Sequence, residues 1–112
     1  MQDWNKYRVK LMNRISDVHK AAPEIIKGVT ILGQAGEKQN LLGAKVHELI
    51  ALAVGVTTRC DGCIAVHVKK AKELGATEEE IAEALGVAVA LNAGAALTYS
   101  ARVIDALRQL PD

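Results

Sequence analysis

The stretch Cys60-Asp61-Gly62-Cys63-Ile64-Ala65-Val66-His67 holds both cysteines of the chain and one of its three histidines. If residues 61–74 form a helix, Cys60, Cys63 and His67 recur at i, i+3 and i+7, which places them on one face near the helix start. Glu48 stands twelve residues before Cys60, on the helix expected to precede this one. A thiol pair, an imidazole and a carboxylate can therefore converge on one pocket, which predicts thiol redox chemistry.

Each residue type in this stretch suits that chemistry. The thiolate is the reactive form of cysteine, and a helix N-terminus lowers the pKa of a thiol there. Cα atoms at i and i+3 lie about 5–6 Å apart, which a disulfide can span. His67 can take a thiol proton or stabilise the thiolate as imidazolium, and Glu48 can hold His67 oriented. No flavin, haem or metal is required for this cycle.

Two other interpretations of the stretch stay open. Cys60 and Cys63 could be inert core residues, with His67 an incidental surface group. Alternatively, Cys60, Cys63 and His67 could bind a metal such as Zn²⁺, with Glu48 or water as the fourth ligand. Structural zinc sites normally have a second ligand pair elsewhere, and this chain offers none. Redox chemistry is therefore the favoured interpretation.

Outward from this stretch, apolar residues recur at steps of three and four, and no segment alternates with period two for long. The pattern predicts an all-α fold. The helix expected from about Gly43, which carries Glu48, is apolar on almost every side and should be central. Helices are expected from Trp4 to Val18, from Pro23 to about Gly33, from about Gly43 to Val56, over 61–74, and from the capping box Thr77-Glu78-Glu79-Glu80 onward.

Three details of this pattern are specific enough to check. Residues 33–40 contain two glycines and several polar side chains, so we expect a loop there. Gly75 should end the helix that begins after Cys60. Asn92-Ala93-Gly94 should bend or break the next helix before a last one reaches about Leu110.

Length and composition limit the classes of protein. The length of 112 residues predicts one domain over residues 1–112. Because 50% of the residues are apolar and none is Phe, we expect closely packed helices. A small domain this apolar should also expose apolar surface, which a homo-oligomer would cover. A net charge of +1 without a basic block argues against a nucleic-acid or anionic-membrane surface. Residues 1–20 are charged throughout, so we expect no secretory signal and a cytoplasmic location.

One run of sequence approaches membrane-spanning length. Ala84 to Ala101 carries no charge, but Gly86, Asn92, Gly94, Thr98 and Ser100 interrupt it. We therefore expect helices buried in protein here rather than a membrane span.

The pattern Glu48-x11-Cys60-x2-Cys63-x3-His67 resembles the active-site motif of the alkylhydroperoxidase D-like branch of the carboxymuconolactone decarboxylase family. Both flanks agree with it: Glu48-Leu49-Ile50-Ala51-Leu52-Ala53 precedes the motif, and Gly75-Ala76-Thr77-Glu78-Glu79-Glu80-Ile81-Ala82-Glu83-Ala84-Leu85 follows it. The resemblance covers roughly residues 40–105. It is specific because the spacing and both flanks match together.

The resemblance implies an all-α, alkylhydroperoxidase D-like bundle of about five to six helices that assembles into trimers or hexamers. It also implies a peroxidase in which the cysteine pair reduces organic hydroperoxides and becomes a disulfide, restored by a lipoyl-type or thioredoxin-like dithiol. Cys63, nearer His67, is expected to attack the peroxide and Cys60 to close the disulfide, with the reverse assignment left open. Glu48 and His67 would relay protons.

The sequence also departs from the family pattern. Better-studied members have a further histidine directly before the second cysteine, whereas this chain has Gly62. We expect the proton-transfer role of that histidine to be missing here. Two alternative functions follow: a redox-responsive oligomeric or ligand-binding module, and a carboxymuconolactone decarboxylase-like enzyme. The lactone decarboxylases of the family lack the cysteine pair, so Cys60 and Cys63 point away from the second.

Overall fold

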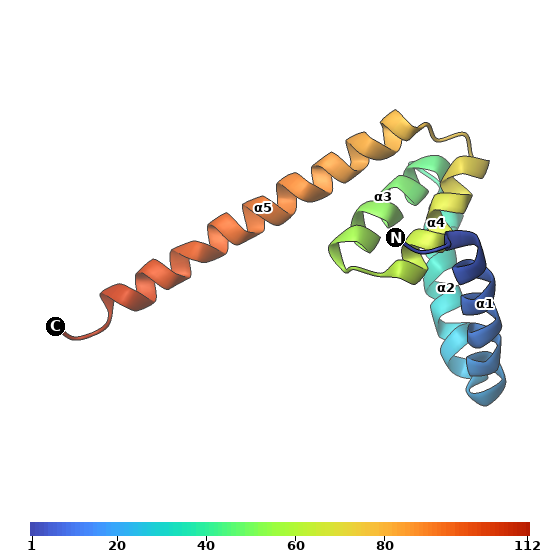
Figure 1. The fold of residues 1–112 in the computed structure, drawn as a ribbon, viewed down its shortest axis with the longest axis horizontal. Helices are drawn as coiled ribbons and strands as arrows, with labels where there is room; N and C mark the ends of the chain where they lie inside the picture. Colours follow the sequence, from blue (N-terminus) through green and yellow to red (C-terminus); the bar gives the residue numbers. More distant parts are fainter.

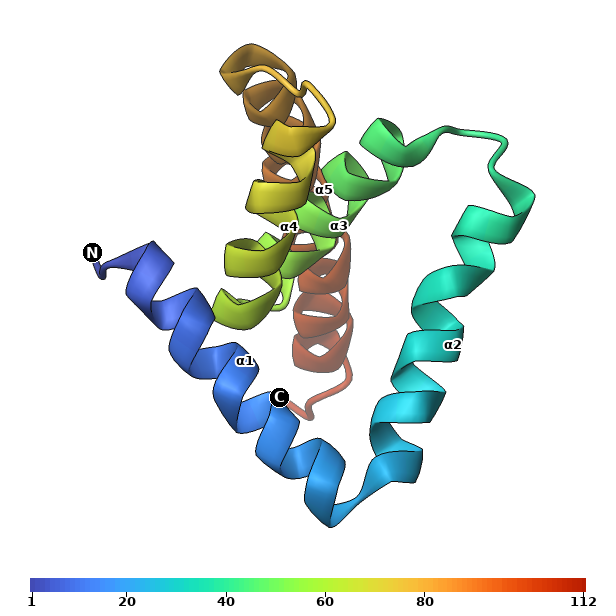
Figure 2. The ribbon, with the colours of Figure 1, turned by 90° about the vertical axis from the view of Figure 1, so that its right-hand side faces the viewer.

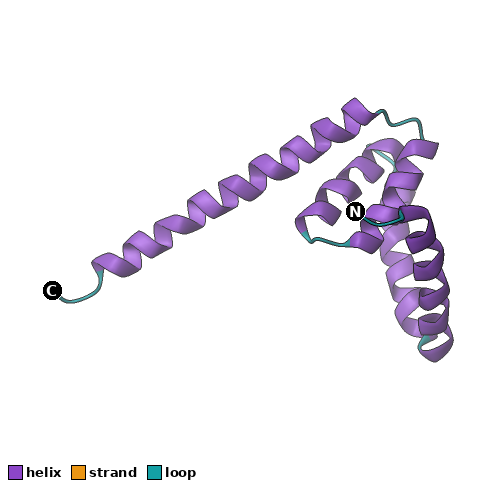
Figure 3. Ribbon diagram, viewed as in Figure 1, coloured by secondary structure: helices purple, strands orange, loops and turns teal.

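The computed structural model describes all 112 residues and contains five helices and no strand (Figure 1, Figure 3). The prediction of an all-α fold with five to six helices is confirmed. The helices are α1 (Trp4–Ala21), α2 (Pro23–Gln39), α3 (Ala44–Thr57), α4 (Asp61–Glu73) and α5 (Glu78–Arg108).

Helix α3 lies at the centre of the packed part of the molecule, with α4 and the first half of α5 against it. Its near-continuous apolar sequence fits this place, because a helix with two packed sides needs apolar residues around most of its circumference. The buried residues of the chain are Leu52 and Gly55 of α3, Ala65 and Ala71 of α4, and Ala88 of α5. Most of them are small, so the three helices approach closely.

The helix ends follow local signals in the sequence. Pro23 begins α2. The Thr77 side chain accepts from the Glu80 N–H, and the Glu80 carboxylate accepts from the Thr77 N–H, so the predicted capping box begins α5. Gly75, at φ 84°, follows the end of α4 in the left-handed conformation that glycine adopts most readily.

Two predicted breaks are absent. Helix α2 continues through Gly33 and ends only at Gln39, before Asn40 in the left-handed conformation (φ 49°). Gly36, expected in a loop, lies inside α2, where its missing side chain leaves room for the His47 ring. Helix α5 is continuous through Asn92 and Gly94. The Asn92 side-chain amide donates to the Ala88 carbonyl, one turn earlier, at 2.7 Å. It therefore does not offer the backbone an alternative to its helical hydrogen bonds.

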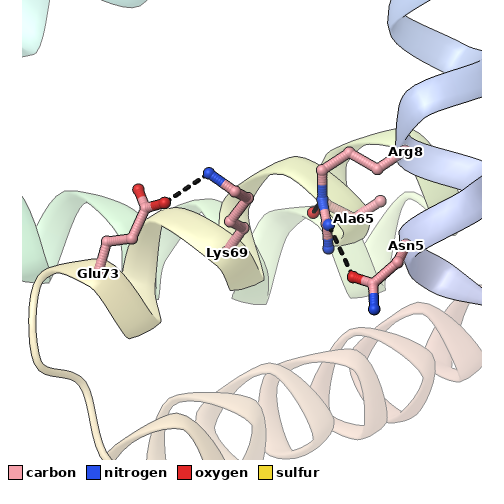
Figure 4. A network of polar contacts seen from close by, with 5 residues as sticks. All are labelled: Asn5, Arg8, Ala65, Lys69 and Glu73. Atoms are coloured by element: carbon pink, nitrogen blue, oxygen red, sulfur yellow. Dashed lines mark hydrogen bonds and ion pairs between the residues drawn. The ribbon is translucent and has the colours of Figure 1, made fainter.

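Helices α1 and α2 form an open V (Figure 2). Helix α1 connects this V to the centre of the molecule, because it crosses the start of α4. Arg8 of α1 holds this crossing: its Nε donates to the Ala65 carbonyl of α4 at 2.7 Å, and its Nη1 donates to Asn5 Oδ1 at 3.0 Å (Figure 4). Lys69 and Glu73 form an ion pair further along α4, and the Lys69 ammonium lowers the pKa of the Glu73 carboxyl.

Helix α5 extends far beyond the other helices (Figure 1). Helix α3 ends at Thr57, whose hydroxyl accepts from the Asn92 amide at 2.9 Å. Residues of α3 and α5 line a shallow groove between the two helices, and Ala95 is the last residue of α5 in it. We call residues 96–108 of α5 the C-terminal arm. By length and composition α5 is the one helix that could cross a membrane, yet only 6% of its apolar window is buried. The expectation that residues 84–101 pack inside the protein is therefore not met within one chain.

Candidate redox site

The two cysteines occupy the first turn of α4 and are joined in a disulfide, with their Cα atoms 5.2 Å apart. Cys60 is the N-cap residue, and its sulfur accepts from the Cys63 backbone N–H at 3.1 Å. The Cys60 N–H donates to the Gly55 carbonyl at 2.9 Å, which fixes the chain between α3 and α4. The pair is thus held at a helix N-terminus, where exposed N–H groups and the helix dipole stabilise a thiolate.

Glu48 and His67 meet across the interface between α3 and α4. His67 Nδ1–H donates to Glu48 Oε2 at 2.6 Å, which joins residues 19 positions apart in the chain. The Glu48 side chain is 15% exposed and that of His67 31% exposed, so the carboxylate is the inner partner. This contact occupies Nδ1 and leaves Nε2 as the ring nitrogen that can accept or deliver a proton.

The cysteines and the Glu48–His67 pair share the side of α4 that faces α3. Cys63 and His67 are one helical turn apart on α4. A Cβ atom added at Gly55 of α3 would lie 3.2 Å from the Cβ of Cys63, so α3 approaches closely here because position 55 has no side chain. The structure thus brings together the four residues that the sequence singled out, and Gly55 is an addition to them. Its position in the sequence, as a glycine inside an otherwise apolar helix, is the feature that could have indicated a close helix contact there.

Gly62, between the two cysteines, faces α1. A Cβ atom added at this position would lie 3.0 Å from Leu11 Cδ2 and 3.9 Å from the Tyr7 hydroxyl. A side chain such as the histidine of better-studied relatives would therefore have to displace the end of the Leu11 side chain. Tyr7 and Leu11 belong to the helix expected from Trp4 to Val18, and no local pattern indicated that they lie over the redox turn.

The remaining histidines lie apart from this site. The His47 ring packs on Gly36 of α2, with its Cε1 atom 3.3 Å from where a Cβ would be. His47 therefore faces α2, whereas Glu48 faces His67 of α4. His19 is in the last turn of α1 and is exposed. The described chain holds no group of three or more His, Cys, Asp or Glu side chains placed to bind a metal ion.

The sequence pattern that defines the carboxymuconolactone decarboxylase family matches residues 23–106. The chain belongs to this family. The matched range begins at the first residue of α2, takes in α3 and α4 with the redox site, and ends two residues before the end of α5. The predicted family membership is confirmed.

Relatives within the carboxymuconolactone decarboxylase family share nearly the whole chain. An uncharacterized protein from Haemophilus influenzae is 45% identical over 104 residues, which are 93% of this chain and 92% of the relative. An uncharacterized protein encoded in the cox locus of Paracoccus denitrificans is 32% identical over 86% of each chain. The crystal structure of a family member from Legionella pneumophila, in its apo form, superposes with a TM-score of 0.74 at 34% identity, covering 95% of both chains.

Proposed function

We propose that this protein is a thiol-dependent peroxidase that cycles Cys60 and Cys63 between dithiol and disulfide. The observation that carries the proposal is the 2.6 Å contact between Glu48 and His67, one helical turn from a cysteine pair at a helix N-terminus. A carboxylate, an imidazole and a thiol in this arrangement match the pattern of an activated nucleophile, in which the base is itself oriented by a third group. Membership of the carboxymuconolactone decarboxylase family supports this chemistry through its alkylhydroperoxidase D-like members.

The proposed cycle has three balanced steps. The Cys63 thiolate attacks the terminal oxygen of a hydroperoxide ROOH, the O–O bond breaks, and the products are the Cys63 sulfenic acid and the alcohol ROH after one proton is delivered to the alkoxide. The Cys60 thiol then attacks the sulfenic acid, which forms the disulfide and releases water. An external dithiol reduces the disulfide and leaves as its own disulfide.

Each polar group has a defined task in this cycle. His67 Nε2 takes the Cys63 thiol proton and delivers it to the departing alkoxide, while Glu48 holds the ring by Nδ1 and stabilises the imidazolium formed in between. The Cys63 N–H that donates to the Cys60 sulfur stabilises a thiolate at Cys60. That thiolate is then the better leaving group when the reductant opens the disulfide, because a more stable thiolate leaves faster.

The proposed reductant is a lipoyl-type or thioredoxin-like dithiol, and the proposed location is the cytoplasm, where such donors keep thiols reduced. The choice of reductant follows from the resemblance to alkylhydroperoxidase D-like proteins, and a compartment that keeps thiols reduced suits a catalytic cysteine pair. A dithiol donor restores the pair in two thiol–disulfide exchanges, without a metal or flavin on this chain.

The test is hydroperoxide-dependent oxidation of dihydrolipoamide, measured for the unaltered protein and for Cys60→Ser and Cys63→Ser. Turnover should be lost in both variants. The Cys60→Ser variant should still consume one equivalent of cumene hydroperoxide and hold a sulfenic acid at Cys63 that dimedone traps. Equal turnover in all three proteins would refute the proposal, and a trapped sulfenic acid only in Cys63→Ser would exchange the roles of the two cysteines.

The histidines of the chain provide a matched pair for the relay. His67→Gln should slow disulfide formation after peroxide addition about 100-fold, the order of magnitude of one general acid–base group. His47→Gln should leave the rate unchanged, because His47 packs on α2, away from the cysteines. A similar loss in both variants would mean that the effect comes from damage to the fold rather than from the relay.

A further inference from the structure

The N-terminal part of the chain is held against the redox turn, the first turn of α4 with its two cysteines (residues 60–63; Figure 2). The Gln2 amide donates to Asp61 Oδ2 at 3.3 Å, and Arg8 Nε donates to the Ala65 carbonyl at 2.7 Å (Figure 4). The two acceptors are one helical turn apart on α4. Tyr7 lies between the two donors in the sequence, so the stretch that carries it is fixed against the turn.

Tyr7 brings a hydroxyl group to the redox turn. Its oxygen lies 3.9 Å from where a Cβ atom of Gly62 would be, and Gly62 stands between the two cysteines. The Trp4 ring meets the Tyr7 ring edge-on, with the centroids 5.9 Å apart, which limits how far the phenol can turn away. The hydroxyl makes no hydrogen bond within the chain, and it is not sealed from solvent. It is therefore free to bind a molecule that enters from solvent.

Tyr7 and His67 reach the redox turn from different helices. The Glu48–His67 pair lies between α3 and α4, whereas Tyr7 comes from α1. On the α1 side, Gly62 offers no side chain and Leu11 is apolar, so the Tyr7 hydroxyl is the unpaired donor that α1 places there. A hydroperoxide at the cysteines would thus lie between an imidazole and a phenol.

We infer that Tyr7 is a further catalytic residue, whose hydroxyl donates a hydrogen bond to the departing oxygen of the hydroperoxide; this inference rests on the proposed peroxidase function. As the Cys63 thiolate attacks the terminal oxygen of ROOH, the S–O bond forms, the O–O bond breaks and negative charge moves onto the RO oxygen. The Tyr7 hydroxyl stabilises this charge, and a donor already in place needs little reorganisation during the reaction. The proton that completes ROH still comes from the His67 imidazolium, so Tyr7 ends the step with its own proton.

The basicity of the leaving group separates this role from a structural one. In the Cys60→Ser background the reaction stops at the Cys63 sulfenic acid, so only the peroxide step is timed. tert-Butyl hydroperoxide expels a strongly basic alkoxide, which gains most from a hydrogen-bond donor, whereas peracetic acid expels the weakly basic acetate. Tyr7→Phe removes the hydroxyl and keeps the ring. It should slow the reaction with tert-butyl hydroperoxide about 100-fold, the scale of losing one donor to a developing oxyanion, and leave the reaction with peracetic acid nearly unchanged.

Quenched-flow alkylation of the Cys63 thiol measures both rate constants, and Tyr99 provides the matched control. Tyr99 is on the C-terminal arm and 68% exposed, with the Arg102 guanidinium 5.0 Å from its ring centroid, so Tyr99→Phe should change neither rate constant.

Three results would overturn the inference. Equal slowing of both peroxides by Tyr7→Phe would mean that the hydroxyl supports the fold instead. Unchanged rate constants would mean that it does not reach the peroxide. Either of these results would leave the peroxidase itself standing. If neither cysteine, left alone by replacing the other with serine, reacts with either peroxide, the peroxidase is refuted and the role of Tyr7 with it.

Discussion

Replacing Gly62 by alanine tests how α1 is seated over the redox turn. The new Cβ atom would lie 3.0 Å from Leu11 Cδ2, whereas carbon atoms in ordinary contact are about 3.5–4.0 Å apart. Leu11 must therefore move by roughly half an ångström or more. Overpacking of this kind costs about 1–3 kcal/mol, and the gain in helix propensity from glycine to alanine offsets up to about 1 kcal/mol of it.

The net expectation for Gly62→Ala is a loss of about 0–2 kcal/mol in the free energy of unfolding. The same substitution at Gly28, inside α2 with no neighbour within 4 Å, should gain about 0.5–1 kcal/mol. In a Leu11→Ala background the clash is absent, so Gly62→Ala should become stabilising by up to about 1 kcal/mol. The interaction between positions 11 and 62 should then be about 1–3 kcal/mol.

Urea unfolding followed by circular dichroism measures these values. All variants are compared as the disulfide form and at one chain concentration, because an associating protein gains stability with concentration. A Gly62→Ala variant that gains as much as Gly28→Ala, in both backgrounds, would refute the placement of α1 over Gly62. The same cycle with Gly62→His would show whether the family's histidine fits only when Leu11 is removed.

Three further predictions concern contacts that hold the helices around the site. The Lys45 ammonium, and then the Thr77 N–H, hold the pKa of the Glu80 carboxyl below its usual value. Glu80 therefore contributes stability above that usual value and loses it as the pH falls through the lowered one. The melting temperatures of unaltered protein and Glu80→Gln should differ at pH 7, and this difference should shrink steadily as the pH falls below the usual carboxyl value; a constant difference would contradict this. Arg8→Met removes the charged donor to the Ala65 carbonyl and should cost about 1.5–3 kcal/mol in urea unfolding, with no loss expected if the contact is absent in solution. Thr77→Ala should cost about 1 kcal/mol and Thr77→Ser much less, whereas equal costs would mean that the hydroxyl does not cap α5.

Features that depend on a few neighbouring residues could be predicted from the sequence. Pro23, Gly75 and the capping box at Thr77 act through backbone geometry within one turn, so the starts of α2 and α5 and the end of α4 were foreseen. The helical periodicity of Cys60, Cys63 and His67 likewise fixed their common face before the structure was known. The contact with Glu48 needed one more assumption, that α3 runs beside α4, and the apolar sequence of α3 supported it.

Features that depend on how helices cross could not be predicted. Gly36 indicates a loop when read locally, yet it lies inside α2 beneath the His47 ring. The contact of Leu11 with Gly62 depends on the crossing of α1 over α4, which no local pattern encodes. Continuity of α5 through Asn92 depends on side-chain contacts with Ala88 and Thr57 that satisfy the amide.

The most direct test of the account is a single turnover of the reduced protein. One equivalent of cumene hydroperoxide is added per chain, the reaction is quenched with an alkylating reagent, and intact mass and peptide mapping report the thiols. The account predicts that each hydroperoxide consumed yields one cumyl alcohol and one Cys60–Cys63 disulfide, and that Glu48→Gln slows this conversion without changing its stoichiometry. Hydroperoxide that persists while Cys60 and Cys63 both remain free thiols would contradict it.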